Sequence, residues 1–173
     1  MILRYLGPSV LIASNLDDVI GLVEEGLDDF TTNAQGDVGS KVRIEAAKAV
    51  AAIWSDGEGQ PKRQYIRERL CGRVMRTASE KLDKVRREGQ KCLLLDPSDG
   101  SQASTLEPSP ESYFLALLNM QLLPWWTTSP QALTWSEAFM SGYITSADTG
   151  ASALVQASRM ALLTFCEASS ANT

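Results

Sequence analysis

The chain has 173 residues, of which 44% are hydrophobic and 21% are charged, so it can build an apolar core and is not expected to be disordered. No stretch approaches the roughly 18 consecutive apolar residues that a membrane span needs. The net charge of −5 and the isoelectric point near 4.8 disfavour a nucleic-acid-binding protein.

The cysteine and histidine content argues against disulfide-stabilised and zinc-binding classes of protein. Cys71, Cys92 and Cys166 are far apart and odd in number, and the chain has no histidine, so neither a disulfide framework nor a usual zinc site is expected. The sequence also lacks a phosphate-binding loop and a Gly-x-Ser-x-Gly nucleophile motif. We therefore expect a cytoplasmic protein that is not an enzyme and needs no cofactor.

The first two helices are predicted from apolar spacing and capping residues. Ser14 or Asn15 can cap a helix whose apolar side runs from Leu16 to Leu27. After a loop at 31–36, Asp37 can cap a helix over 38–54. In that second helix an apolar stripe is expected to face the core, with the charged side chains off it; its members are Val42, Ala46, Val50 or Ala49, and Ile53.

The rest of the chain also has helical periodicity. A second helical hairpin is predicted over 62–82 and 84–95, because apolar residues recur every four positions in its first arm; these are Ile66, Leu70, Val74, Ala78 and Leu82. A polar stretch with several prolines, 96–110, is expected to be a flexible loop. Three further helices follow at 111–123, 131–143 and 151–165, and the last two are expected to form a hairpin.

An internal repeat links the first two hairpins. Val42-Arg43-x-Glu45-x-x-Lys48 matches Val85-Arg86-x-Glu88-x-x-Lys91 at an offset of 43 residues. This period lies within the roughly 40 to 47 residues of HEAT and armadillo repeats, in which helix pairs stack and bury one another's apolar faces. The sequence thus predicts an all-α, HEAT/armadillo-like solenoid that forms one domain over residues 1–173.

Two acid–base pairs recur with the repeat. Asp37 precedes Arg43 in the first copy, and Asp83 precedes Arg86 in the second. Residues repeated at one register commonly form a ladder between neighbouring repeats, so a structural role is expected, although a contact with a partner is also open.

Charge is concentrated in the second hairpin. Residues 62–91 carry eleven Lys and Arg against four Asp and Glu, whereas residues 1–61 carry four against ten. Arg69, Arg73 and Arg76 are spaced to share one face of the predicted helix. They are predicted to point outward as a dock for an acidic partner; a solvated helix face is the alternative.

Two tryptophans are the remaining candidates for partner binding. Trp125 and Trp126 follow Pro124, and tryptophan is enriched in interface hot spots. Packing beneath a loop is the alternative, since large aromatic side chains are usually mostly buried.

Five ordered segments resemble the carboxy-terminal domain of tubulin-folding cofactor D. The resemblance spans most of the chain, and Gln35 departs from it, since a basic residue is expected there. The segments are Phe30 to Arg43, Ala78 to Arg86, Ser112 to Leu115, Pro124 to Trp126, and Gly142 to Gly150 leading to Ser158 to Leu162.

The resemblance implies a chaperone that assembles the tubulin heterodimer. Members of this family capture β-tubulin and act with cofactors E and C and an Arf-like small GTPase. The assembled complex, not one residue of this chain, would stimulate GTP hydrolysis by tubulin. A cytoplasmic, microtubule-associated location is implied as well. The alternative from the sequence is a generic HEAT-type scaffold for another acidic protein.

Overall fold

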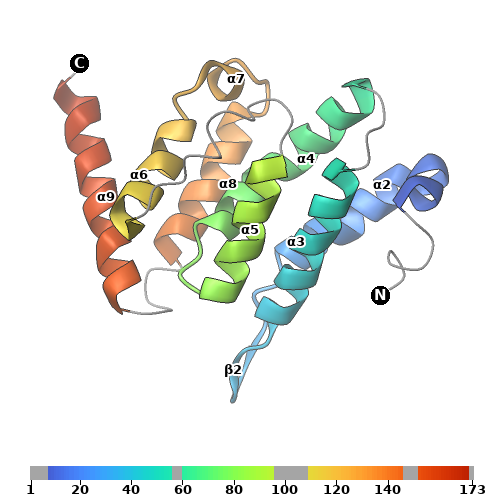
Figure 1. Cartoon of the computed structure of the whole chain (residues 1–173), viewed down its shortest axis with the longest axis horizontal. Helices are drawn as coiled ribbons and strands as arrows, with labels where there is room; N and C mark the ends of the chain where they lie inside the picture. Colours follow the sequence, from blue (N-terminus) through green and yellow to red (C-terminus); the bar gives the residue numbers. More distant parts are fainter. Residues whose placement is uncertain (1–7, 56–59, 96–108, 146–151, 172–173) are drawn as a thin grey trace.

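The computed structural model of the chain describes residues 8–55, 60–95, 109–145 and 152–171. These residues form helices and one short hairpin of strands, so the all-α helical repeat fold is confirmed (Figure 1). The elements are α2 (Pro8–Leu27), β1 (Thr32–Asn33), β2 (Gly36–Asp37), α3 (Gly39–Ser55), α4 (Gln60–Ala78), α5 (Asp83–Leu95), α6 (Pro110–Met120), α7 (Pro124–Thr127), α8 (Ala132–Thr145) and α9 (Ser152–Ala171).

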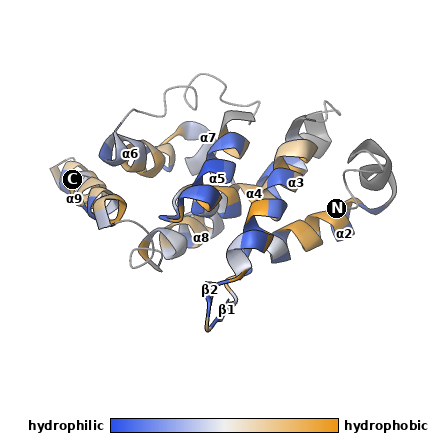
Figure 2. Ribbon diagram, turned by 60° about the horizontal axis from the view of Figure 1, so that its bottom comes forward, coloured by the Kyte–Doolittle hydropathy of each residue, from blue (hydrophilic) through white to orange (hydrophobic). Residues whose placement is uncertain are grey.

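Most of the helices lie in two layers. α3 and α5 lie side by side in one layer, and α2, α4 and α8 lie side by side in the other (Figures 1 and 2). Consecutive helices α2 and α3, and then α4 and α5, pack across the layers as the two predicted hairpins. α6 and α9 pack against each other at the end of the molecule away from α2.

The first hairpin begins and ends at residues that explain its boundaries. α2 begins at Pro8, before the cap predicted at Ser14 or Asn15, but Asn15 has non-helical backbone angles and kinks the helix at that position. Asp37 caps α3, because its Oδ1 accepts a hydrogen bond of 2.8 Å from the Ser40 amide. The helices approach closely where α2 has Gly26, since a Cβ there would lie only 2.9 Å from the Cβ of Ala46.

The core is continuous along α4, which contacts helices on both sides. The predicted four-residue stripe of α4 is buried from Ile66 to Ala78, whereas Leu82 lies beyond the end of the helix. α8 crosses α4 at Gly72, where a Cβ would lie 2.8 Å from the Trp135 backbone. Glycine is therefore required at the centre of the molecule for α8 to pack this closely.

The predicted apolar face of α3 is correct at Val50 and Ile53, which are buried, and wrong at Val42. Val42 is 44% exposed, whereas the neighbouring Arg43 is 1% exposed, and Ala47 and Val50 continue the buried side. Arg43 can be buried because three acceptors surround its guanidinium, so the assumption that a charged residue faces solvent fails here.

The predicted hairpin of α8 and α9 is also wrong. α8 packs mainly on α4 and α9 packs mainly on α6. The hydroxyl of Tyr143 in α8 still donates a 2.8 Å hydrogen bond to the Ser158 carbonyl in α9. The connecting turn at 146–151 lies outside the described residues, as does most of the loop predicted at 96–110.

Two further boundaries differ from those predicted. Pro124 begins the short helix α7, and it does not only end the helix before it, because proline suits the first position of a helix. α9 continues to Ala171, beyond its predicted end at 165. Within the described ranges, no helix combines the length and apolarity that a bilayer crossing requires.

Candidate functional site

The three candidate arginines lie on α4 and face the acidic side of α2. Arg69 donates to Glu24 at 2.5 Å, and Arg73 binds Asp28 at 2.8 Å and Glu24 at 3.3 Å. Arg76 binds Asp28 at 3.2 Å. Carboxylates four residues apart, Glu24 in α2 and Asp28 directly after it, thus match arginines four and three residues apart on α4. We call these five residues the α2–α4 ladder.

The ladder corrects one expectation about the basic hairpin. The three arginines share a face, as predicted, but this face meets α2 and is not free in solvent. Their side chains are only 38%, 32% and 20% exposed, in chain order. The hydrogen bonds with Glu24 raise the pKa of Arg69, whereas burial lowers the pKa of Arg76. A role of these arginines in partner binding stays a prediction.

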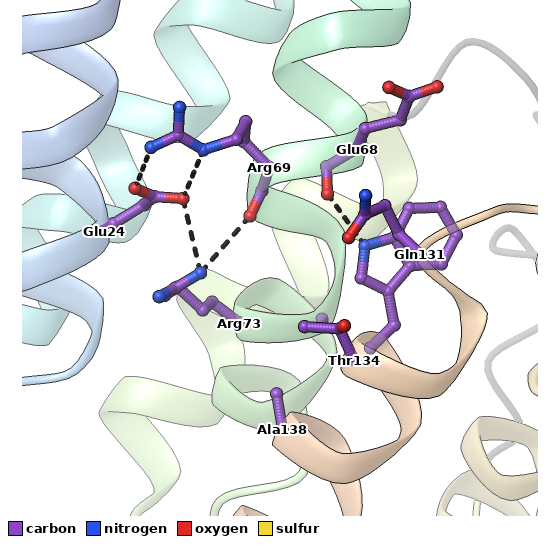
Figure 3. A pocket seen from close by; sticks show the side chains of 9 residues that line it. Glu24, Glu68, Arg69, Arg73, Gln131, Thr134 and Ala138 are labelled. Atoms are coloured by element: carbon purple, nitrogen blue, oxygen red, sulfur yellow. Dashed lines mark hydrogen bonds and ion pairs between the residues drawn. The ribbon is translucent and has the colours of Figure 1, made fainter.

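A small pocket lies beside the ladder, between α2, α4 and α8 (Figure 3). Its volume is about 180 Å³, and Gly72 and Trp135 contribute to its lining. Two arginines and two glutamates line it, so their formal charges cancel: Arg69, Arg73, Glu24 and Glu68. Arg69 and Arg73 already bind Glu24 (Figure 3), and Arg73 also binds Asp28, so the pocket has little free charge to attract an ion.

A second polar network joins the two repeats. The buried Arg43 donates to Asp37 at 2.6 Å and to Glu80, at the turn between α4 and α5, at 2.8 Å. It also donates to the Asp29 carbonyl at 2.5 Å. Burial raises the pKa of Glu80, although the hydrogen bonds from Arg43 oppose this effect. The predicted pairing of Asp37 with Arg43 is therefore present and reaches into the next repeat.

Glu80 is the member of this network that the sequence prediction missed. Asp83 does bind Arg86, as proposed, but within one turn of α5. Glu80 follows Asp37 by 43 residues, which is the same offset that relates Arg86 to Arg43. Glu80 is thus the true repeat counterpart of Asp37, and applying the 43-residue period to Asp37 would have found it.

The two candidate tryptophans belong to an aromatic cluster. Trp126 is buried, and its indole nitrogen donates to the Ser136 hydroxyl at 3.0 Å. The rings of Trp125, Trp126 and Trp135 lie within 6.4 Å of one another, measured between ring centroids. Trp125 is partly buried beneath the Arg67 guanidinium, which lies 4.2 Å from its ring. Trp126 is thus a packing residue, whereas Trp125 is less buried.

Two further residues, outside the candidate site, hold unusual positions. Lys81 is buried and donates to the Tyr143 carbonyl at 2.6 Å. Phe30 is 39% exposed, with the guanidinium carbons of Arg76 and Arg43 at 4.0 and 4.3 Å from its ring centroid. Neither position has a signal in local periodicity, because both depend on contacts between distant segments.

The described residues contain no group of three or more His, Cys, Asp or Glu side chains that could hold a metal ion. Cys71 and Cys92 are buried, and burial raises the pKa of the Cys92 thiol to about 12, which disfavours the reactive thiolate. The polar clusters of the described residues bind one helix to another. Their geometry suits a protein scaffold better than a reaction centre.

The family model described as "Tubulin folding cofactor D C terminal" matches residues 68–173. The matched part begins within α4 and includes every described element after it, through α9. No curated protein and no solved structure matched the chain.

Proposed function

Because the chain belongs to the tubulin folding cofactor D C-terminal family, we propose that it is a tubulin-folding chaperone module that binds β-tubulin, partner cofactors or both during assembly of the heterodimer. The observation that carries this proposal is the family match over more than half of the chain. A tubulin-folding cofactor role follows from the family, and the direct contact with β-tubulin is the part proposed here.

The architecture supports this role. Stacked helix pairs present an extended surface that suits a large protein partner. The pocket beside the α2–α4 ladder, at about 180 Å³, is smaller than the roughly 300 to 1,000 Å³ usual for small-molecule sites. A folded protein is therefore a better ligand for this surface than a metabolite.

The proposal extends to the wider assembly. Cofactors E and C and an Arf-like small GTPase are the proposed partners in a cytoplasmic, microtubule-associated complex. GTP hydrolysis by tubulin would be stimulated by that complex as a whole. The chain would contribute binding and orientation, without a catalytic residue of its own.

Direct binding tests the proposal. The purified chain is immobilised, and tubulin heterodimer, β-tubulin held by its cofactors, and the small GTPase are passed over it separately. We expect saturable binding of at least one tubulin-containing species that survives nuclease treatment. A helical repeat protein of similar acidity serves as the control. If no tubulin-containing species binds beyond this control, the proposed function is wrong.

A further inference from the structure

The connection between α2 and α3 is longer than packing requires. Eleven residues, 28–38, join the two helices, whereas connections between packed helices usually have about two to eight. The extra length forms the β1–β2 hairpin, which projects beyond the helices (Figures 1 and 2). Every residue from Phe30 to Gly36 is exposed, so this segment adds little to the core.

Hydrogen bonds close the hairpin at both its tip and its base. At its tip the Asn33 side chain accepts a 2.7 Å bond from the Gln35 amide, and Gly36 takes a φ of +111° that favours glycine. At its base the Thr31 carbonyl accepts bonds from two successive amides, those of Val38 and Gly39. A loop held in one conformation loses little entropy when a partner binds it.

The composition of the hairpin indicates the kind of partner. No charged residue occurs from Phe30 to Gly36, although 21% of the chain is charged. Threonine, asparagine and glutamine side chains provide neutral donors and acceptors there. The flanking carboxylate of Asp37 points inward to Arg43, and the Asp29 side chain accepts from the Thr31 amide, so neither adds a free charge to the tip.

An exposed aromatic ring stands at the base of the same hairpin. The guanidinium groups of Arg76 and Arg43 hold the Phe30 ring in place, yet 39% of the residue is exposed. Interfaces are enriched in aromatic residues and depleted of lysine and glutamate in their centres. The Phe30 ring beside the neutral polar hairpin therefore has the composition expected at the centre of a protein interface.

We propose that residues 30–36 form a docking finger that inserts into an uncharged polar cleft of the tubulin client, with Phe30 against an apolar side chain at its rim. The inference rests on the proposed function, because it takes its partner from there. It differs from docking by the basic hairpin, since binding through neutral groups depends little on salt.

Charging the tip tests the inference. Ala34→Glu with Gln35→Glu introduces two carboxylates at exposed positions and leaves the main-chain hydrogen bonds intact. Gln156→Glu with Thr164→Glu adds the same charge to the exposed side of α9 and is the matched control. Affinity for the tubulin-containing species is measured at low and high salt, after circular dichroism and melting confirm folding.

We expect the tip variant to bind at least about tenfold more weakly than wild type, while the α9 control binds normally and salt changes the wild-type affinity little. If wild type binds and the tip variant binds equally well, the docking finger is wrong while the proposed function stands. Equal weakening by both variants also overturns the inference. If wild type binds no tubulin species, the proposed function fails and the inference falls with it.

The opposite charges complete the test. Ala34→Lys with Gln35→Lys should also weaken binding, because any charge is costly in an uncharged cleft. Tighter binding of this variant would show an acidic partner surface and would overturn the neutral cleft.

Discussion

At the scale of single residues, Lys81 is a cation that the fold removes almost completely from water. Its ammonium group lies 4.6 Å from the ring centroid of Tyr143 and 5.5 Å from that of Phe114, and the residue is 1% exposed. Burial lowers the pKa of Lys81 to about 8, since the charged form is disfavoured away from solvent. The ammonium group fixes the turn after α4 to the end of α8.

This pKa predicts a pH dependence of stability. Between about pH 8 and 10.5, the unfolded chain keeps the Lys81 proton that the folded chain has lost. Because the unfolded state binds more protons, the free energy of unfolding should rise with pH across this window, by up to roughly 3 kcal/mol. The measurement is urea unfolding of wild type and Lys81→Met at several pH values.

The difference in unfolding free energy between wild type and Lys81→Met reports on Lys81 alone, because the buried thiol and phenol groups are present in both proteins. Wild type should gain stability relative to Lys81→Met as the pH rises. Lys84→Met, at an exposed lysine in the first turn of α5, is the control and should follow wild type. If the free energy of unfolding changes with pH in the same way for wild type and Lys81→Met, the prediction is wrong.

At the scale of elements, the register of α3 decides which substitutions are harmful. Val50 is fully buried, so Val50→Asp places an unpaired charge in the core and should cost more than about 4 kcal/mol. Val42 is 44% exposed, so Val42→Asp should cost less than about 1 kcal/mol. Thermal melting of the two variants measures the difference. Similar melting temperatures would contradict the observed register.

The sequence predicted the longer helices because each one has strong periodicity or a cap of its own, but it did not predict the short helix α7. α3 and α5 begin within one residue of the positions expected from Asp37 and Asp83. The burial of Arg43 in α3 was missed because periodicity alone treats arginine as an exposed polar residue. Its burial depends on Asp29 and Glu80, which are distant in sequence and become visible only in the fold.

The candidate site was predicted less well, for the same reason. The spacing of Arg69, Arg73 and Arg76 correctly gave a shared face, but not the neighbour that the face meets. Glu24 in α2 and Asp28 directly after it match that spacing, and only the packing of α2 against α4 shows that the two sets pair. The pairing of α8 with α4 likewise joins segments that are not adjacent in sequence.

At the scale of the whole molecule, polar contacts connect the first helical hairpin to the second on both layers. The α2–α4 ladder joins one layer, and the bond from Arg43 to Glu80 links α3 to the turn between α4 and α5. Apolar burial of Ile20, Val23 and Leu27 adds to the attachment of α2. The first hairpin should therefore unfold together with the rest of the described structure.

Reversing the ladder's charges tests this coupling. Arg69→Glu, Arg73→Glu and Arg76→Glu would place three carboxylates against Glu24 and Asp28, so attraction becomes repulsion along the whole contact. We expect a loss of roughly 2 to 4 kcal/mol, since partly exposed ion pairs each contribute up to about 1 kcal/mol and like charges add to the cost. Amide hydrogen exchange should show α2 losing protection before α8.

The matched control reverses three cations that pair only within their own helices. These are Lys48, Arg87 and Lys91, whose partners lie three or four residues away. Their reversal should cost less, because such exposed pairs are weak, and it should not loosen α2 selectively. If the ladder variant keeps wild-type protection in α2, the five residues are not what couples the first hairpin to the second, and its apolar contacts together with the bond from Arg43 to Glu80 hold it.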